Sequence, residues 1–144
     1  MRAIEWVKRF SNRAAPKDKA LHILAITLSG SDRAAIDRVT NRSNWFLSCC
    51  GTREEAIELL ATLSYPIVVY DRELDDIDWR EAVRKLAKAA PSACILLASP
   101  VADEYLWQEV VLHGGYDVLK KPLKEEAVAH AIDQALLYWN GTTR

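Results

Sequence analysis

The 144-residue sequence has little of the residue types that mark collagen-like, low-complexity or disulfide-stapled chains. It contains five glycines, five prolines and three cysteines. So few glycines and prolines argue against a collagen-like or disordered chain. The odd cysteine count, with Cys49 next to Cys50, provides neither a disulfide framework nor a CxxC metal pair. Because these two residues and Cys94 lie in apolar stretches, we interpret them as small buried hydrophobic residues in a reducing cytoplasm.

Long apolar runs and an excess of one charge are also missing. The longest apolar runs have the length of buried strands, and none reaches the roughly 18 residues of a membrane-spanning helix. Lys and Arg number 19 against 20 Asp and Glu, which leaves a net charge of −1. This balance predicts neither nucleic acid nor a membrane as the partner. Half of the residues are hydrophobic, and this share and the length together predict one compact domain.

The first 20 residues differ from the rest of the chain in charge. Six basic residues against two acidic ones give them a net charge of +4, which leaves −5 for the remainder. Ile4, Val7 and Phe10 stand at helical spacing beside Trp6, so residues 1–20 are predicted to form a basic amphipathic extension of the domain at residues 21–144. This extension is a candidate interaction element, and packing over its own domain is the alternative.

From residue 21 onward, apolar runs of strand length alternate with helical patterns. The five predicted strands are Leu21–Thr27, Trp45–Cys50, Ile67–Tyr70, Ala93–Ser99 and Tyr116–Leu119. Such alternation predicts parallel pairing with right-handed crossovers. The expected fold is therefore α/β: a three-layer, doubly wound, five-stranded parallel sheet with an N-terminal helical extension. In such a sheet the functional crevice lies beyond the carboxyl ends of the strands.

Local signals place the ends of some helices. Thr52 followed by Glu55 has the capping-box pattern, and Gly114-Gly115 is typical of a helix C-terminus. The last helix is expected from about Lys124 to Trp139. Its predicted inner side consists of Ala127, Ala131, Ala135 and Leu136.

Three polar side chains stand where predicted strands end. Asp71 follows the third strand, Ser99 ends the fourth, and Lys121 follows the fifth. A carboxylate can accept a phosphoryl group, a hydroxyl can hydrogen-bond to its oxygens, and a lysine can pair with the new charge.

These residues and their surroundings resemble the receiver domain of bacterial two-component response regulators over about residues 20–140. The matching motifs are YPIVVYDREL around Asp71, ILLAS ending at Ser99, and GGYDVLKKPL around Lys121. The resemblance implies a flavodoxin-like fold, with Asp71 as the phosphoacceptor, Ser99 as the switch hydroxyl and Lys121 as the phosphate-pairing lysine. It also implies a cytoplasmic signalling protein rather than an enzyme, with a histidine kinase or a downstream effector as its protein partner.

The sequence departs from the receiver pattern at the metal site. Receiver domains carry two adjacent acids after the first strand that hold Mg²⁺, and the matching positions are Thr27 and Leu28. Mg²⁺ is bound through oxygen ligands that usually include one or two carboxylates. Asp32, one turn into the next helix, is a poor substitute, and Glu73 is only a weak candidate ligand. We therefore expect no metal site and no cofactor, with Mg²⁺ as a doubtful exception.

A second departure concerns the surface through which receiver domains signal. The switch aromatic, usually three residues before the lysine, is replaced by Val118, so a swinging ring cannot couple the site to the surface there. Receiver domains interact and dimerise through their fourth helix, fifth strand and fifth helix. The interaction-face candidates on these elements are Trp107, Tyr116, Val118 and Trp139.

Three hypotheses of function follow. The first is a stand-alone, divergent receiver domain that acts through protein–protein interaction, including a homodimer, with Asp71 neutralised by Lys121 and Mg²⁺-dependent phosphorylation inefficient or absent. The alternative is a conventional phosphoacceptor in a histidine kinase phosphorelay, with Asp71 phosphorylated. The third is a small-ligand or nucleotide binder on the same scaffold, although the sequence lacks the glycine-rich phosphate-binding motifs.

Overall fold

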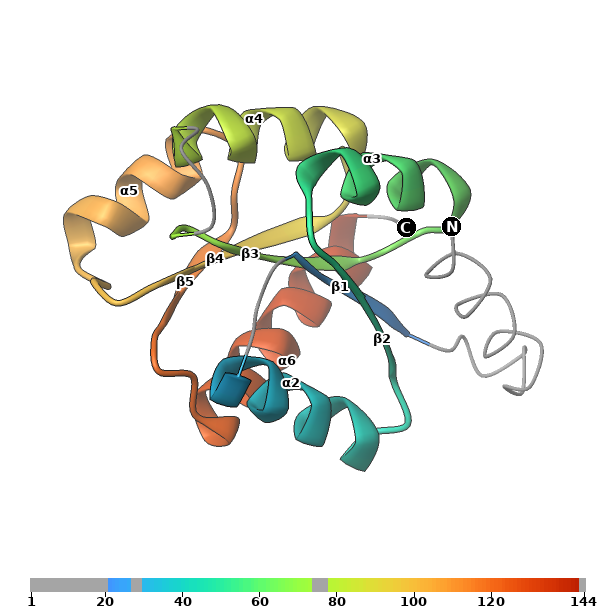
Figure 1. Cartoon of the computed structure of the whole chain (residues 1–144). Coiled ribbons are helices and arrows are strands. Elements are labelled where there is room, and N and C mark those ends of the chain that lie inside the picture. The colour runs from blue at the N-terminus through green and yellow to red at the C-terminus, as the bar shows by residue number, and fades with distance from the viewer. Residues whose placement is uncertain (1–20, 27–29, 74–77, 143–144) are drawn as a thin grey trace.

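A computed structural model describes residues 21–26, 30–73 and 78–142. The predicted extension at residues 1–20, and the positions Thr27 and Leu28, lie outside the described residues. The described elements follow one another in the predicted alternation (Figure 1). They are β1 (His22–Ile26), α2 (Gly30–Arg42), β2 (Phe46–Cys50), α3 (Arg53–Thr62), β3 (Ile67–Asp71), α4 (Trp79–Ala89), β4 (Cys94–Ser99), α5 (Glu104–Leu112), β5 (Asp117–Lys120) and α6 (Glu125–Thr142).

The five strands form one parallel sheet in the order β2-β1-β3-β4-β5. Helices α2 and α6 cover one face, and α3, α4 and α5 cover the other (Figure 1). The predicted doubly wound fold is thus confirmed. The chain moves outward from β1 to β2 and then returns to β3, so the strand order reverses between β1 and β3. The crevice of such a sheet lies beyond the carboxyl ends of the strands at this reversal.

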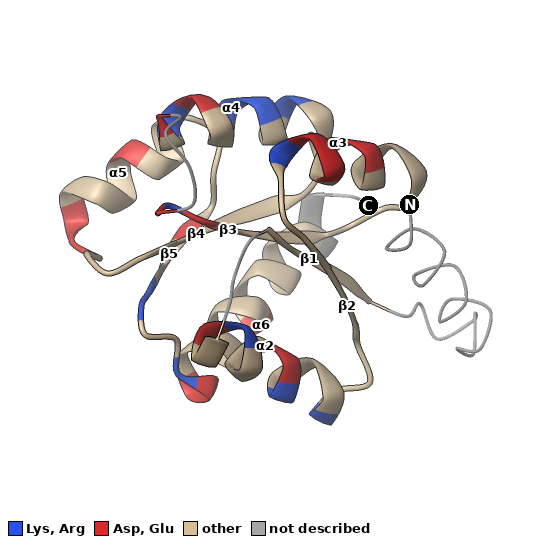
Figure 2. Ribbon diagram, viewed as in Figure 1, with Lys and Arg blue, Asp and Glu red and all other residues tan. Residues whose placement is uncertain are grey.

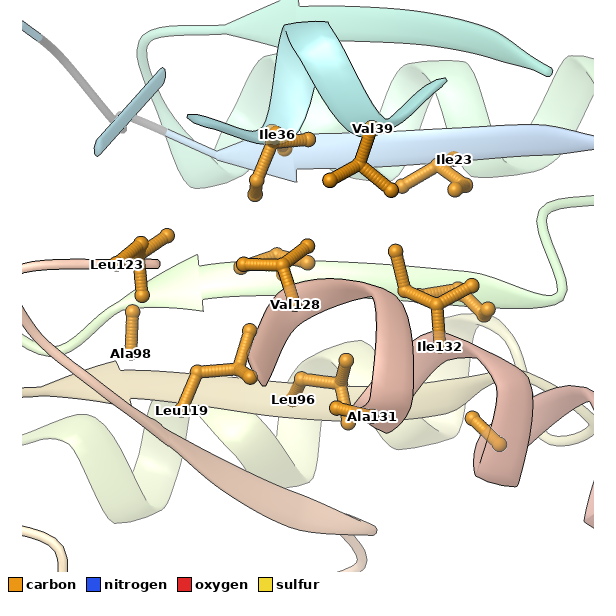
Figure 3. Close-up of a cluster of buried hydrophobic side chains, with 14 of the residues drawn as sticks. Ile23, Ile36, Val39, Leu96, Ala98, Leu119, Leu123, Val128, Ala131 and Ile132 are labelled. Atoms are coloured by element: carbon orange, nitrogen blue, oxygen red, sulfur yellow. The ribbon is translucent and has the colours of Figure 1, made fainter. Parts of the chain in front are cut away.

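Each face of the sheet is sealed by its own apolar cluster. Toward α2 and α6, Ile23 and Leu96 of the sheet pack against Ile36, Val128 and Ile132 of the helices (Figure 3). Toward α3, α4 and α5, the alternate strand residues pack against helix residues that include Leu59 and Leu86. Strands β1, β3 and β4 are buried on both faces, which explains their near-continuous apolar sequence.

Helix α6 corrects one expectation. Its buried stripe runs through Val128, Ala131, Ile132 and Ala135, whereas Ala127 is exposed and Leu136 is only partly buried. Successive helical residues are about 100° apart, and the bulkier Val128 and Ile132 determine the side that faces the sheet. The prediction is thus confirmed for Ala131 and Ala135, is wrong for Ala127, and omitted Val128 and Ile132.

The cysteines and the predicted helix ends give a mixed result. Cys94 is buried, but Cys49 and Cys50 on the edge strand β2 are only half-buried. Thr52 caps α3 by accepting from the Glu55 backbone N–H at 3.1 Å. None of the helices in the described part of the chain is both long and apolar enough to cross a membrane.

Candidate functional site

Asp71 is the last residue of β3, at the carboxyl end of the sheet, and it is buried. Its carboxylate accepts two short contacts from the Lys121 ammonium, 3.1 Å to Oδ1 and 2.9 Å to Oδ2. The Glu73 backbone N–H donates to Oδ1 at 2.9 Å. The structure therefore brings together the carboxylate at the end of β3 and the amine that follows β5, although β4 lies between these strands. This carboxylate is an acceptor in three contacts.

Lys121 is the centre of this cluster rather than a partner of Asp71 alone. Its Nζ also lies 3.0 Å from Glu73 Oε1 and 3.8 Å from Asp32 Oδ2. The Lys121 side chain is only 15% exposed, as is that of Asp32, while Glu73 reaches in from the surface. One ammonium is thus surrounded by three carboxylates from α2, from the end of β3 and from the loop after it.

The charge of Lys121 is favoured by this setting. Burial alone would lower its pKa, but hydrogen bonds to Asp71 and Glu73, and the negative charges of both, together raise it above its ordinary value. The ammonium is therefore the stable form throughout the neutral range.

Asp32 is a site residue that the sequence analysis set aside. Its Oδ1 accepts from the Leu123 backbone N–H at 2.8 Å, and its Oδ2 faces Lys121. It therefore ties the start of α2 to the segment after β5. Its place in the first turn of α2 was visible in the sequence, but the proximity of that turn to the residues after β5 depends on the strand order.

Ser99 belongs to a second group of polar residues. Its hydroxyl oxygen accepts from the Arg72 guanidinium at 3.3 Å and from the Val101 backbone N–H at 3.1 Å. The Arg72 guanidinium also lies 5.8 Å from the centroid of the Trp79 ring, within reach of a cation–π contact. Asp71 continues the alternation of β3 residues that face α2 and α6, whereas Ser99 continues the β4 residues that face the other helices.

The two groups are joined through the backbone. The Lys121 N–H donates to the Ser99 carbonyl at 2.8 Å, and the Arg72 N–H donates to the Ala98 carbonyl at 2.9 Å. All three predicted residues thus lie at one edge of the sheet, but the side-chain partner of the Ser99 hydroxyl is Arg72. Arg72 was missed, although its position directly after Asp71 was a signal that could have drawn attention to it.

The residues at this edge do not fit a Mg²⁺ ion of the receiver type. Thr27 and Leu28 bring no carboxylate, and Asp32, Asp71 and Glu73 all direct an oxygen at the Lys121 ammonium. Across the described ranges, no three His, Cys, Asp or Glu residues are arranged to hold a metal ion. Lys121 therefore stands as the cation among the three carboxylates.

The four interaction-face candidates differ in exposure. Trp107 on α5 is 44% exposed. Trp139 and Tyr116 are partly buried against the cluster on the α2 and α6 face, whereas Val118 packs against the opposite cluster. Tyr116 and Val118 therefore face opposite sides of the sheet. Besides Trp107, the exposed large apolar side chains of α5 and α6 are Tyr105, Val111, Leu112, Leu137 and Tyr138.

Comparison with solved structures identifies the same fold in response regulator receiver domains. The chemotaxis response regulator CheY4 of Vibrio cholerae has a TM-score of 0.72 and 16% identity, covering 81% of this chain and 99% of that chain. The signal receiver domain of an HD domain-containing protein from Pseudomonas fluorescens Pf-5 has a TM-score of 0.75 and 19% identity, covering 87% and 93%. A CheY-like receiver domain protein from Methanospirillum hungatei JF-1 has a TM-score of 0.71 and 16% identity, covering 86% and 99%.

At these identities the matches show a shared fold. No protein-family model matches the chain, and no curated protein sequence matches it. The fold expected from the receiver resemblance is therefore confirmed by structure, at a sequence distance where the individual site residues carry the functional argument.

Proposed function

We propose that this chain is a receiver-type domain of two-component signalling that acts through protein–protein contacts, with Lys121 as a built-in cation beside Asp71. The observation that carries the proposal is the Lys121 ammonium, in contact with Asp71 and Glu73 and 3.8 Å from Asp32. The shared fold supports the assignment to two-component signalling.

The argument for inefficient phosphorylation rests on charge. Transfer of a phosphoryl group to a carboxylate concentrates negative charge, which a metal ion normally offsets. Lys121 offers one positive charge, and three carboxylates already share it. A phosphoryl group entering here would have to displace these contacts without the help of the acids that Thr27 and Leu28 replace.

A domain of this kind would present one shape to its partner instead of two. The partner would be a histidine kinase or a downstream effector, and Trp107 on α5 is the most exposed of the four predicted interaction residues. A homodimer through the same elements is the other mode that the resemblance implies.

The first experiment is phosphorylation with acetyl phosphate and Mg²⁺, followed by intact-protein mass measurement. We expect an unchanged mass for the wild type. A stoichiometric, Mg²⁺-dependent mass increase that disappears in Asp71→Asn would establish the conventional phosphoacceptor instead.

The second experiment tests the role of Lys121 directly. Removing the ammonium in Lys121→Met should leave three carboxylates that attract a divalent cation, so Mg²⁺ should bind more tightly to this variant than to the wild type. Lys120→Met is the matched control, since Lys120 is the exposed neighbour. Equal Mg²⁺ affinities of all three proteins by calorimetric titration would refute the built-in cation.

A further inference from the structure

The opposite edge of the sheet has a different character from the Asp71 edge. Each helix follows a strand and runs back antiparallel to it, so the helices end where the strands begin. Near this amino edge, Leu112 at the end of α5 is 75% exposed, and Leu137 and Tyr138 in the last turns of α6 are 69% and 55% exposed. Three large apolar side chains thus face solvent on two helix ends.

A hollow of about 340 Å³ lies at the same edge. It is lined by residues 91–94 before and at the start of β4, by residues 114–116 before β5, and by Tyr138. The Tyr138 ring lies 5.3 Å from that of Tyr116, so the two aromatic rings form one wall. The space is large enough for an aromatic side chain.

The ends of α5 and α6 favour a basic occupant, unlike those of α2 and α4, whose last turns contain Arg42 and Lys88. A helix C-terminus carries a partial negative charge that basic residues normally offset. The last turns of α5 and α6 contain no basic residue. Figure 2 shows acidic residues and no basic ones along α5, in agreement with its sequence, whose charged residues are Glu104 and Glu109. An occupant that is both apolar and basic would offset the partial negative charge of the two helix ends and would cover the exposed apolar side chains.

The chain itself contains such a segment. Residues 1–20 have a net charge of +4 and carry Ile4, Trp6, Val7 and Phe10. They join the domain at Leu21, directly before β1 begins, and so at this same edge. Tethering raises the effective concentration of a segment to about the millimolar range, which favours a contact within one molecule over a contact between two.

The distance can be covered. In the sheet order, β1 and β5 are three strand spacings apart, which amounts to roughly 15 Å. An extended residue spans about 3.3 Å. Residues 13–20 can therefore cross this distance and the thickness of a helix, which leaves residues 1–12, with all four apolar side chains, to lie over the hollow.

We propose that residues 1–12 dock in the same molecule over the ends of α5 and α6, with an aromatic side chain, Trp6 or Phe10, in the hollow lined by Tyr116 and Tyr138. The basic residues of the segment then lie near the carboxyl ends of these two helices. This docking is independent of the Asp71 edge, so its test is separate from that of the proposed function.

The test is trypsin cleavage after Lys8 and Arg9 of the full chain, followed by mass spectrometry, with a peptide of residues 1–20 as the unprotected reference. Docking predicts cleavage of the wild type at least about tenfold slower than of the peptide, because the protease acts on the open population. A double variant, Leu112→Ser with Leu137→Ser, should approach the peptide rate. Ile57→Ser removes an exposed apolar residue of α3 and should keep the wild-type rate.

Two outcomes would overturn the proposal. Equal cleavage rates for the wild type, both variants and the peptide would show that the segment does not dock on this edge. Protection that fades on dilution would assign the contact to a second molecule. Nuclear Overhauser contacts from the ring of Trp6 or Phe10 to the ring of Tyr116 or Tyr138 provide a second readout in the unmodified chain, and the absence of all of them would also contradict docking.

Discussion

At the scale of single residues, Lys121 makes more contacts with charged side chains than a simple ion pair would. Its ammonium meets Asp71, Glu73 and, at longer range, Asp32, while its backbone N–H binds the Ser99 carbonyl. Because the side chain is largely buried, these contacts are less weakened by solvent than a surface ion pair would be. The stability of the Asp71 edge should therefore depend on this one charge.

Replacing Lys121 by Met should lower the free energy of unfolding at pH 7 by about 1–3 kcal/mol, since a buried carboxylate loses a charged hydrogen-bond partner. The folded protein raises the pKa of Lys121 above 10.5, its unperturbed value. The stabilisation is thus fully present below pH 10.5 and is lost as the pH rises through the higher folded value. The stability difference between wild type and variant should shrink accordingly in urea unfolding measured from pH 7 to pH 11.

Lys120→Met serves as the reference for this measurement, because Lys120 is exposed and should cost little at any of these pH values. A Lys121→Met stability loss no larger than that of Lys120→Met would show that the ion cluster contributes nothing to folding.

The residues of the site were predictable to different degrees. Asp71, Ser99 and Lys121 could be found because each follows or ends an apolar strand, and parallel strands end at one edge. Asp32 depends on how the start of α2 meets the chain after β5, and the Arg72 contact with Ser99 depends on the direction in which a side chain leaves β3. Neither is encoded in local spacing, so neither was predicted.

At the scale of the elements, the turn between α5 and β5 depends on two glycines. Gly114 has a φ of 103°, in the region that favours glycine, and the Gly115 N–H donates to the Val110 carbonyl at 2.8 Å. A Cβ on Gly115 would lie 2.5 Å from Val110 Cγ1 and 3.2 Å from the Val110 oxygen. The close return of the chain to the sheet requires that residue 115 have no side chain.

Gly115→Ala should therefore lower the free energy of unfolding by about 1–3 kcal/mol, the range for overpacking a close-packed site. In Gly51→Ala the new Cβ would meet only Glu55 Oε1, at an ordinary 3.8 Å. This control should be neutral or stabilising by up to about 1 kcal/mol, because alanine restricts the unfolded chain. Urea midpoints that fall equally in both variants would contradict the packing argument.

The elements themselves were largely predictable, because in this fold each has a strong local pattern. Strands β1 to β5 each differ from the predicted ranges by one residue at one or both ends. On α6 the error was Ala127, since alanine spacing alone cannot show where the buried stripe ends or that Val128 and Ile132 belong to it. Burial against the sheet decides this, and burial is a property of the assembled layers.

At the scale of the whole molecule, the two faces of the sheet share their central strands. Ile23 and Val69 face the cluster under α2 and α6, while their neighbours Leu24 and Val68 face the cluster under α3, α4 and α5. Loss of packing on one face therefore removes support from the strands that hold the other. A domain of this size, built in this way, should unfold as one unit.

Two buried residues on opposite faces test this cooperativity: Leu86 on α4 and Ile132 on α6, both fully buried. Leu86→Ala and Ile132→Ala should each cost about 2–5 kcal/mol, through lost burial and the cavity left behind. Each should shift the midpoints by circular dichroism and by tryptophan fluorescence equally, since Trp79 lies in one cluster and Trp139 packs on the other. Ile57→Ala, at a partly exposed site, should leave both midpoints nearly unchanged. Separate midpoints in Ile132→Ala would mean that α6 can leave the sheet while the opposite face stays folded. The Asp71 edge would then be held by β3, β4 and β5 without the support of α6.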